Sequence, residues 1–166
     1  MLNTRTWRKK IKESYGIQYV SQKEIEGIIG APNLLWVTRC CLAKSCASGL
    51  PTEMYNSSIL RYFYRFAQEK GLHFAIVSDK HGLHFSDERL PYYDIHPSML
   101  SAEDKKRLGA VIRSKADSRN LKGIIFYNNS PLMSKPYFEM LSESGLEVFF
   151  TTRLPNMKTG ARVDCP

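Results

Sequence analysis

Apolar residues in this chain gather into four short runs that are separated by amphipathic stretches. Each run is continuous rather than alternating and is rich in β-branched or aromatic residues. The four runs are residues 34–38, 74–77, 122–127 and 146–150. Continuous apolar runs of this length predict strands that are buried on both faces, as in a parallel sheet.

Serine caps and apolar residues at helical spacing predict helices between the runs. Ser57 or Ser58 is the expected start of the first helix, and Gly71 is its stop. Ser101 begins the second helix, and the third ends at Gly145. The alternation of strands and helices predicts an α/β fold, a three-layer sandwich around a four-stranded parallel sheet. With the runs numbered in chain order, we expect the strand order 2-1-3-4.

Composition divides the chain into three predicted parts. Residues 1–33 form a basic helical N-terminal extension, in which Ser21 and Glu24 have the spacing of a capping box. Residues 34–152 form the α/β core domain, and residues 153–166 form a basic C-terminal tail. The extension and the tail are expected to flank a single core.

The second apolar run ends in a sharply polar segment. Four polar residues follow it, Ser78, Asp79, Lys80 and His81. Gly82 then offers a backbone that can adopt a positive φ, and no helical or alternating period continues as far as Asp94. An irregular loop after the C-terminal end of a strand is where open α/β sheets bind ligands. The segment 78–94 is therefore the predicted site.

This segment also resembles a known signature. The matching residues are Ser78, Lys80, Gly82, Leu83, Asp87, Leu90, Tyr93 and Asp94, whereas Asp79, Ser86 and Tyr92 depart from it. The pattern, strand-S-x-K-x-G-L followed by Y-D, is similar to that of a family of small α/β domains of unassigned function. It also resembles the peroxide-stress protein family YaaA and, distantly, the uracil-DNA glycosylases and the core of archaeosine synthases. The resemblance implies a three-layer fold with a crevice that handles a nucleobase.

Charge indicates a polyanionic partner. The chain has 24 Lys and Arg against 16 Asp and Glu, a net charge of +8. Five cations crowd around Trp7 near the N-terminus, namely Arg5, Arg8, Lys9, Lys10 and Lys12. Such a segment attracts DNA or tRNA through counterion release, and an aromatic ring can stack on bases. The alternative is a solvated terminus that only aids solubility.

Cofactor and metal signals are weak. The four cysteines are Cys40, Cys41, Cys46 and Cys165, and their spacing is not that of a zinc or iron–sulfur motif. No glycine-rich phosphate loop or dinucleotide fingerprint is present. We therefore predict neither metal nor cofactor. No apolar run is long enough to span a membrane, so a cytoplasmic location is the expectation.

Residues at the ends of the other strands complete the candidate site. Cys40, Cys41 and Lys44 follow the first strand, and Cys40 or Cys41 together with Lys44 is similar to a pattern of the related domains. Lys44 either meets a phosphate or is an exposed loop lysine. Asn128 and Asn129 follow the third strand and either read a base edge or serve turn formation. The sequence His96-Pro97-Ser98 resembles a short glycosylase motif, but it lies at another place in the fold, and we treat it as a coincidence.

Two functions follow from these residues. In the first, the protein acts on or recognises a nucleobase in DNA or tRNA. Asp79 or Asp94 is then a general base or electrostatic stabiliser and His81 an acid–base group. Lys44 and Lys80 hold phosphate, and Cys40, Ser78 and Tyr93 complete the binding residues. In the second, the protein is a non-catalytic DNA-binding accessory or stress-protection protein that uses its basic N-terminus.

Overall fold

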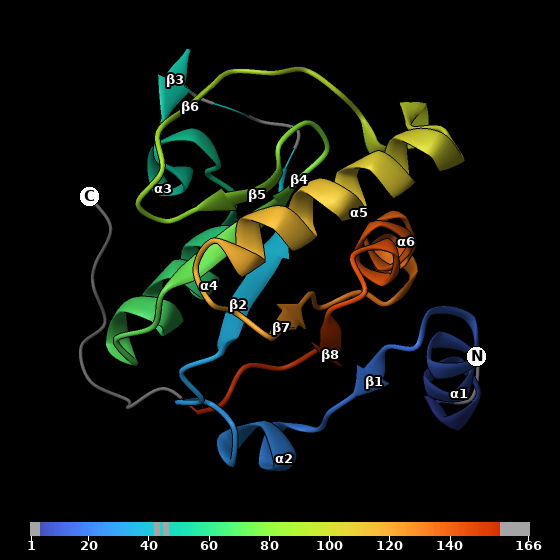
Figure 1. Cartoon of the computed structure of the whole chain (residues 1–166). Helices are drawn as coiled ribbons and strands as arrows, with labels where there is room; N and C mark the ends of the chain where they lie inside the picture. The colour runs from blue at the N-terminus through green and yellow to red at the C-terminus, as the bar shows by residue number, and fades with distance from the viewer. Residues whose placement is uncertain (1–3, 42–43, 45–46, 157–166) are drawn as a thin grey trace.

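A six-stranded, mostly parallel sheet forms the centre of the molecule (Figure 1). The computed structural model describes residues 4–41, 44 and 47–156. The strands of the sheet are β1 (Gln18–Tyr19), β2 (Leu34–Arg39), β4 (Phe74–Ser78), β5 (Gly82–Phe85), β7 (Gly123–Tyr127) and β8 (Glu147–Thr151). Their order is β1-β8-β7-β2-β4-β5. Only β5 runs antiparallel to its neighbour among these described strands.

The four predicted runs are β2, β4, β7 and β8, and their order in the sheet is the predicted one. The prediction of a four-stranded sheet is wrong, because β1 and β5 add one strand at each edge. The segment after β4 is not irregular throughout, since β5 folds back on β4 with Ser78 opposite Gly82. Every residue of β5 is buried, which gives this short strand its stability despite its polar His84.

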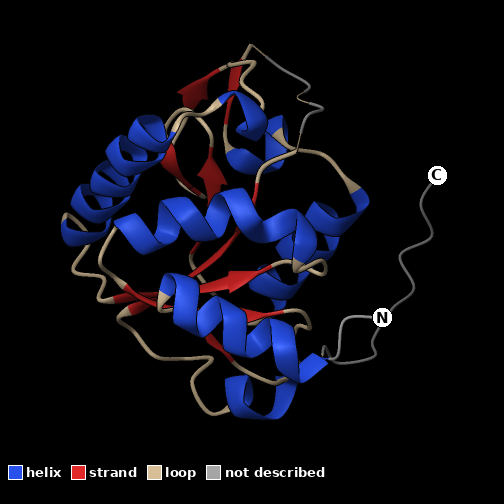
Figure 2. Ribbon diagram, turned by 90° about the vertical axis from the view of Figure 1, so that its right-hand side faces the viewer, coloured by secondary structure: helices blue, strands red, loops and turns tan. Residues whose placement is uncertain are grey.

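Helices flank both faces of the sheet (Figures 1 and 2). The α-helices are α1 (Thr4–Tyr15), α2 (Gln22–Glu26), α3 (Pro51–Met54), α4 (Ser58–Glu69), α5 (Ala102–Asp117) and α6 (Lys135–Glu143). Two 3-10 turns lie in the connections before α5 and α6, namely η1 (Pro97–Met99) and η2 (Leu132–Ser134). A small antiparallel sheet of β3 (Ser48–Gly49) and β6 (Leu90–Pro91) lies apart from the main one.

In β2, β7 and β8, alternate residues belong to two apolar clusters. In β2, Leu35 and Val37 pack with α1, α5 and α6, whereas Trp36 packs with α2 and α4. The same alternation holds in β7, where Phe126 joins the first cluster and Ile125 the second. Both faces of the sheet are therefore covered, as continuous apolar strands require.

Helix ends follow the sequence signals. Ser21 with Glu24 and Ser101 with Asp104 both form the complete capping box. Ser57 caps α4 by accepting a hydrogen bond from the Leu60 amide. These local signals were predicted correctly because a cap depends only on residues within one turn.

The N-terminal segment packs on the sheet edge. β1 pairs with β8, and Ile11 of α1 is buried in the first cluster. The Trp7 ring packs edge-on against Tyr19 at 5.1 Å between centroids and against Phe150 at 6.1 Å. Trp7 is half-buried and contributes to the packing at this edge of the sheet. Cys46 and most of the predicted C-terminal tail, residues 157–166 with Cys165, lie outside the described residues. None of the described helices is long and apolar enough to cross a membrane.

Gly82 adopts the positive φ that its place after the polar turn predicts, with a value of +70°. A Cβ at this position would also lie 3.1 Å from a Val111 methyl and 3.2 Å from Ile112 Cγ1 of α5. The hairpin of β4 and β5 therefore needs a glycine both for its backbone conformation and for its contact with α5.

We expect Gly82→Ala to lower the free energy of unfolding by more than the left-handed penalty of about 1–2 kcal/mol, because the methyl group also meets α5. Gly16→Ala separates the two causes, since Gly16 has φ +67° but open space around its Cβ position. Gly30→Ala is the neutral control, with open space and no positive φ. Urea denaturation measures all three, and equal losses at Gly82 and Gly16 would contradict the contact with α5.

Candidate functional site

A pocket of about 230 Å³ opens at the C-terminal ends of β2 and β4. β2 has β4 on one side and β7 on the other, so the chain reverses its direction across the sheet at β2. Open α/β sheets bind ligands at such a switch point. The polar side chains of Cys40, Asp79 and Tyr137 line the pocket, and most of its remaining wall is apolar. The apolar wall is made by Ile95, Pro97, Leu132, Met133 and Pro136.

Cys40 and Asp79 meet because the pairing of β2 with β4 continues past the end of β2. The Cys40 amide donates a hydrogen bond of 3.1 Å to the Val77 carbonyl. The Cys40 thiol then donates to Asp79 Oδ2 at 3.0 Å, and its sulfur lies 3.6 Å from the Tyr137 hydroxyl. A thiol, a carboxyl and a phenol thus form one hydrogen-bonded group in the pocket.

Burial determines the protonation of this group. Burial, and next the negative charge of Asp79, raise the pKa of Cys40 to about 12. Cys40 is therefore a neutral thiol that donates a hydrogen bond, not a thiolate nucleophile. Burial also raises the pKa of Asp79, although the hydrogen bond from Cys40 acts in the opposite direction.

Asp79 is 2% exposed, and its Oδ1 has no hydrogen-bond partner among the described residues. A buried acceptor without a donor lowers the free energy of unfolding by about 1–3 kcal/mol, and by more if the group is charged. Since Asp79 lines the pocket, a ligand with an N–H or O–H group can supply the missing donor. This makes Asp79 the central candidate residue.

The His96-Pro97-Ser98 segment, which we treated as a coincidence, lines this pocket. The Ser98 amide donates to His96 Nδ1 at 3.2 Å, so a neutral His96 ring carries its proton on Nε2. Ile95 and Tyr137 also line the pocket and were not predicted. The position of a strand end signals Cys40 and Asp79, but no sequence signal links them to Tyr137 on α6.

A second cluster forms around Tyr93, which is buried. Its hydroxyl lies 3.1 Å from that of Tyr55, and the His81 ring packs edge-on against it at 5.3 Å. Lys44 Nζ lies 4.2 Å from the centre of the Tyr93 ring. The Ser78 hydroxyl accepts hydrogen bonds from the amides of residues 80 and 81, which fixes the hairpin turn.

His81 is half-buried and does not line the pocket of Asp79. Burial lowers the pKa of its imidazole. Asp94, Lys80 and Asn129 are exposed, and none of them lines the pocket. The structure thus brings Cys40 and Asp79 together at one site and gathers Ser78, His81, Tyr93 and Lys44 around the hairpin turn.

Asn128 is buried and fully used within the protein. Its Nδ2 donates to Ser134 Oγ at 2.8 Å, and its Oδ1 accepts a hydrogen bond from Arg39 Nε at 3.4 Å. This geometry agrees with the turn-forming alternative rather than with reading a base edge.

The cations of α1 whose side chains are described lie on its outer face. The Arg8 guanidinium lies 3.8 Å from the centre of the Tyr19 ring, and Lys9 pairs with Glu13 at 3.6 Å. Lys10 and Lys12 are exposed. Arg5 belongs to α1, but its side chain lies outside the described part of the structure.

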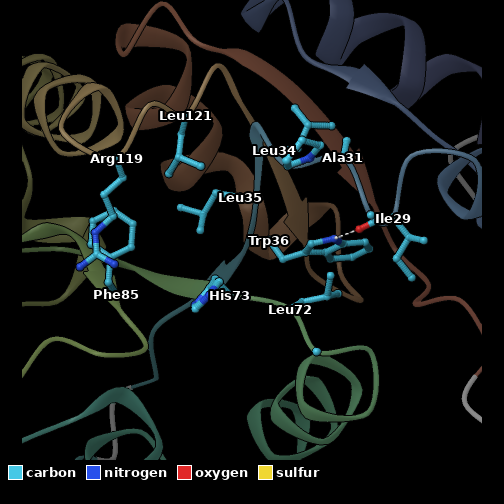
Figure 3. Close-up of a pocket in the computed structure, with 13 residues that line it drawn as sticks. Ile29, Ala31, Leu34, Leu35, Trp36, Leu72, His73, Phe85, Arg119 and Leu121 are labelled. Carbon is cyan, nitrogen blue, oxygen red and sulfur yellow. Dashed lines mark hydrogen bonds between the residues drawn. The ribbon is translucent and has the colours of Figure 1, made fainter.

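A larger pocket of about 350 Å³ lies at the opposite, N-terminal edge of the strands (Figure 3). Its cation Arg119 stacks on Phe85 at 3.8 Å and pairs with Asp87 at 2.8 Å. The indole of Trp36 donates to the Ile29 carbonyl. The side chains of Arg119 and Trp36 thus have partners within the protein, whereas the smaller pocket contains the unpartnered Asp79 Oδ1 and is the better candidate.

No cluster of three or more metal-binding side chains occurs among the described residues. Comparison with known proteins finds no matching family model, no matching curated protein and no matching solved structure. The candidate site therefore has to be interpreted from its own geometry.

We expect Asp79→Asn to raise the free energy of unfolding at pH 7. Burial raises the pKa of Asp79, so the folded state is more stable when the Asp79 carboxyl is protonated than when it is ionised. That stabilisation is present below the pKa of the unfolded state and is lost as the pH rises through the folded pKa. Asparagine resembles the protonated carboxyl, and the advantage of the variant should shrink as the pH falls, as urea denaturation at several pH values will show.

Asp87→Asn is the matched control with the opposite sign. The hydrogen bond from Arg119 lowers the pKa of Asp87, which therefore stabilises the fold above the unfolded pKa and loses this effect as the pH falls through the folded pKa. Asp87→Asn should be less stable than the wild type at pH 7. If both variants change stability in the same direction, the buried carboxyl of Asp79 is not the cause.

Proposed function

We propose that this protein binds one nucleobase of DNA or tRNA in the pocket of Asp79. The observation that carries the proposal is the buried, unpartnered Oδ1 of Asp79 in a pocket with mostly apolar walls. A nucleobase has apolar faces and a polar edge, which is the complement of this arrangement. A hydrogen-bond donor on that edge satisfies Oδ1, while Met133 and Pro136 pack against the ring.

The size of the pocket supports a single heterocycle. Sites for drug-sized ligands have volumes of about 300–1,000 Å³, and this pocket holds about 230 Å³. A dinucleotide cofactor is too large for it. The sugar and phosphate then lie outside, where Arg39 at the pocket and the exposed Lys80 beside Asp79 offer positive charge.

The chemistry of Asp79 favours particular bases. A carboxylate accepts hydrogen bonds from amino and imino groups, as in the pairing of Asp or Glu with the amino group of cytosine. Cytosine, adenine and guanine carry such an amino group on their Watson–Crick edge. Thymine has only one N–H group there, and it is flanked by two carbonyl oxygens that repel a carboxylate. The pocket should therefore prefer amino-bearing bases.

Acid–base catalysis on the bound base is a second candidate function. Burial raises the pKa of Asp79, which brings the carboxyl closer to a state in which it can exchange a proton near neutral pH. Cys40 then holds Oδ2 and leaves Oδ1 for the substrate. In this case Asp79→Asn abolishes turnover of the base. Chromatography of the products from oligonucleotides incubated with the wild type and with the variant tests this.

The accessory function rests on different residues. Lys10 and Lys12 of α1 are exposed and can approach phosphates without any contribution from the pocket. This reading requires no base contact, and its signature is a dependence of affinity on salt alone.

We expect the four nucleoside monophosphates to bind with different affinities in calorimetric titrations, with thymidine monophosphate the weakest. Asp79→Asn should weaken the best of them about tenfold, because one good contact to a base edge contributes about 1–3 kcal/mol. Asp94→Asn is the control, since Asp94 is exposed and outside the pocket. Equal binding by wild type and Asp79→Asn would refute the proposal.

The salt dependence of nucleic-acid affinity distinguishes binding at the pocket from the accessory function. Each cation that meets a phosphate contributes about 0.7–0.9 to the slope of log affinity against log salt concentration. Lys80→Gln should reduce the slope if the nucleic acid lies at the pocket, and the pair Lys10→Gln with Lys12→Gln should reduce it if α1 is the contact surface. Deletion of the N-terminal segment is a poor test, because Ile11 is part of the core. A slope that only the α1 pair changes favours the accessory function.

A further inference from the structure

Exposed apolar side chains gather beside the pocket of Asp79. Among the described residues, the exposed large apolar side chains are Tyr62, Tyr92, Met99, Leu132 and Met133. Leu132 and Met133 belong to η2 and line the pocket, with 79% and 58% of their surface exposed. Met99 ends η1 directly after the pocket residue Ser98 and is 74% exposed. We call Met99, Leu132 and Met133 the apolar rim.

Polar contacts hold the apolar rim in place. On one side, the Asn128 side chain donates to Ser134 Oγ at 2.8 Å, and Ser134 Oγ donates to the Ser130 carbonyl at 2.7 Å. The Ser130 hydroxyl accepts a hydrogen bond from the Met133 amide at 3.4 Å. Exposed leucine and methionine side chains on a turn that is fixed in this way indicate an interaction surface.

η1 is fixed in the same manner on the other side of the pocket. The His96 side chain caps this turn by accepting from the Ser98 amide, and the Met99 amide donates to the His96 carbonyl at 2.9 Å. Two short turns, each stabilised by its own polar contacts, therefore present exposed apolar side chains. Leu132 and Met133 line the pocket, and Met99 follows the pocket residue Ser98.

The charges near the rim favour a polyanion as the occupant. Most cations of α5 and its C-terminal flank have an acidic partner, in the pairs Lys105–Glu139, Arg107–Asp104, Arg113–Asp117, Lys115–Glu88 and Arg119–Asp87. In contrast, Arg39, Lys44 and Lys80 at the C-terminal ends of β2 and β4 form no ion pair within 4.0 Å among the described residues. These three cations thus have no carboxylate in direct contact among the described residues, although Lys44 is close enough to Asp79 for its charge to lower the pKa of that carboxyl.

We propose that the apolar rim packs against the bases that flank the bound one, so that the ligand is a single-stranded polynucleotide rather than a free nucleotide or a closed duplex. This inference rests on the proposed function. In a duplex the target base is stacked and paired, and its extraction costs a few kcal/mol, whereas a single strand offers unstacked bases directly. Apolar side chains can cover the faces of bases that have lost their stacking neighbours, while Arg39, Lys44 and Lys80 meet the phosphates.

The test compares three probes with one pair of proteins. The probes are a fluorescein-labelled single-stranded oligonucleotide of about twelve nucleotides, within the usual range of single-strand site sizes, the same strand in a duplex, and the best-binding nucleoside monophosphate. The test variant is Met99→Ser, because Met99 belongs to the apolar rim but does not line the pocket that binds the base. Its side chain is largely exposed, so the variant should fold, and thermal denaturation checks this. Tyr62→Ser on α4 is the matched control, as an exposed apolar side chain away from the pocket.

We expect the single strand to bind at least about tenfold more tightly than the monophosphate, as one additional covered base provides, and more tightly than the duplex. The test variant should lose this advantage but keep its affinity for the monophosphate, and Tyr62→Ser should change neither. If the variant binds the single strand as the wild type does, or if the duplex binds equally well, the inference is wrong while the proposed function stands. If no monophosphate binds the wild type, the proposed function itself fails.

Discussion

The structure depends on the position of β2 between two parallel neighbours. β4 and β7 pair with it along most of its length, and its side chains reach both apolar clusters. The parallel register brings the C-terminal ends of the three strands to one edge, and the hydrogen bond from the Cys40 amide to Val77 extends the pairing just beyond β2. Cys40 and Asp79 are therefore neighbours as a consequence of sheet pairing. The pocket lies where it does because the chain crosses from one side of β2 to the other at this edge.

The buried carboxyl of Asp79 lowers the stability of the folded state. A buried carboxyl normally has several donors around it, and here one oxygen has a neutral thiol and the other has no partner among the described residues. A lysine or arginine in place of Cys40 would satisfy the carboxylate and hold its pKa low. A thiol instead provides one weak hydrogen bond and leaves the acceptor strength of Asp79 available. Such an incomplete network is typical of sites in which a ligand supplies the remaining contact.

Much of the fold was predictable, because its signals are local or repeat with a fixed period. Four apolar runs identified the central strands, and serine caps identified the starts of α4 and α5. β5 was missed because histidine is a polar residue type, whereas His84 is buried in the structure and hydrogen-bonded to Tyr55 and to the Glu88 carbonyl.

The site was predicted only in part, because its residues meet through tertiary contacts that the sequence does not report. Asp79, Lys80 and His81 are adjacent in sequence, but a tight hairpin turn sends one into the pocket, one to solvent and one against Tyr93. Tyr137 reaches Cys40 across 97 residues of sequence, which no local pattern reports.

Net charge is the clearest case in which the sequence needs the structure to be interpreted. A charge of +8 favours contact with polyanions in general but does not say which surface of the molecule would make that contact. Of the two helices with five Lys and Arg each, α5 has most of its cations paired with carboxylates, so its field is largely cancelled close to the surface. The cations at the ends of β2 and β4 are fewer, but among the described residues no carboxylate pairs with them. Attraction of an anion depends on this unneutralised charge and not on the number of lysines and arginines. One edge of the sheet holds the pocket, the apolar rim and cations that have no carboxylate partner among the described residues. The proposed contact with nucleic acid rests on this combination.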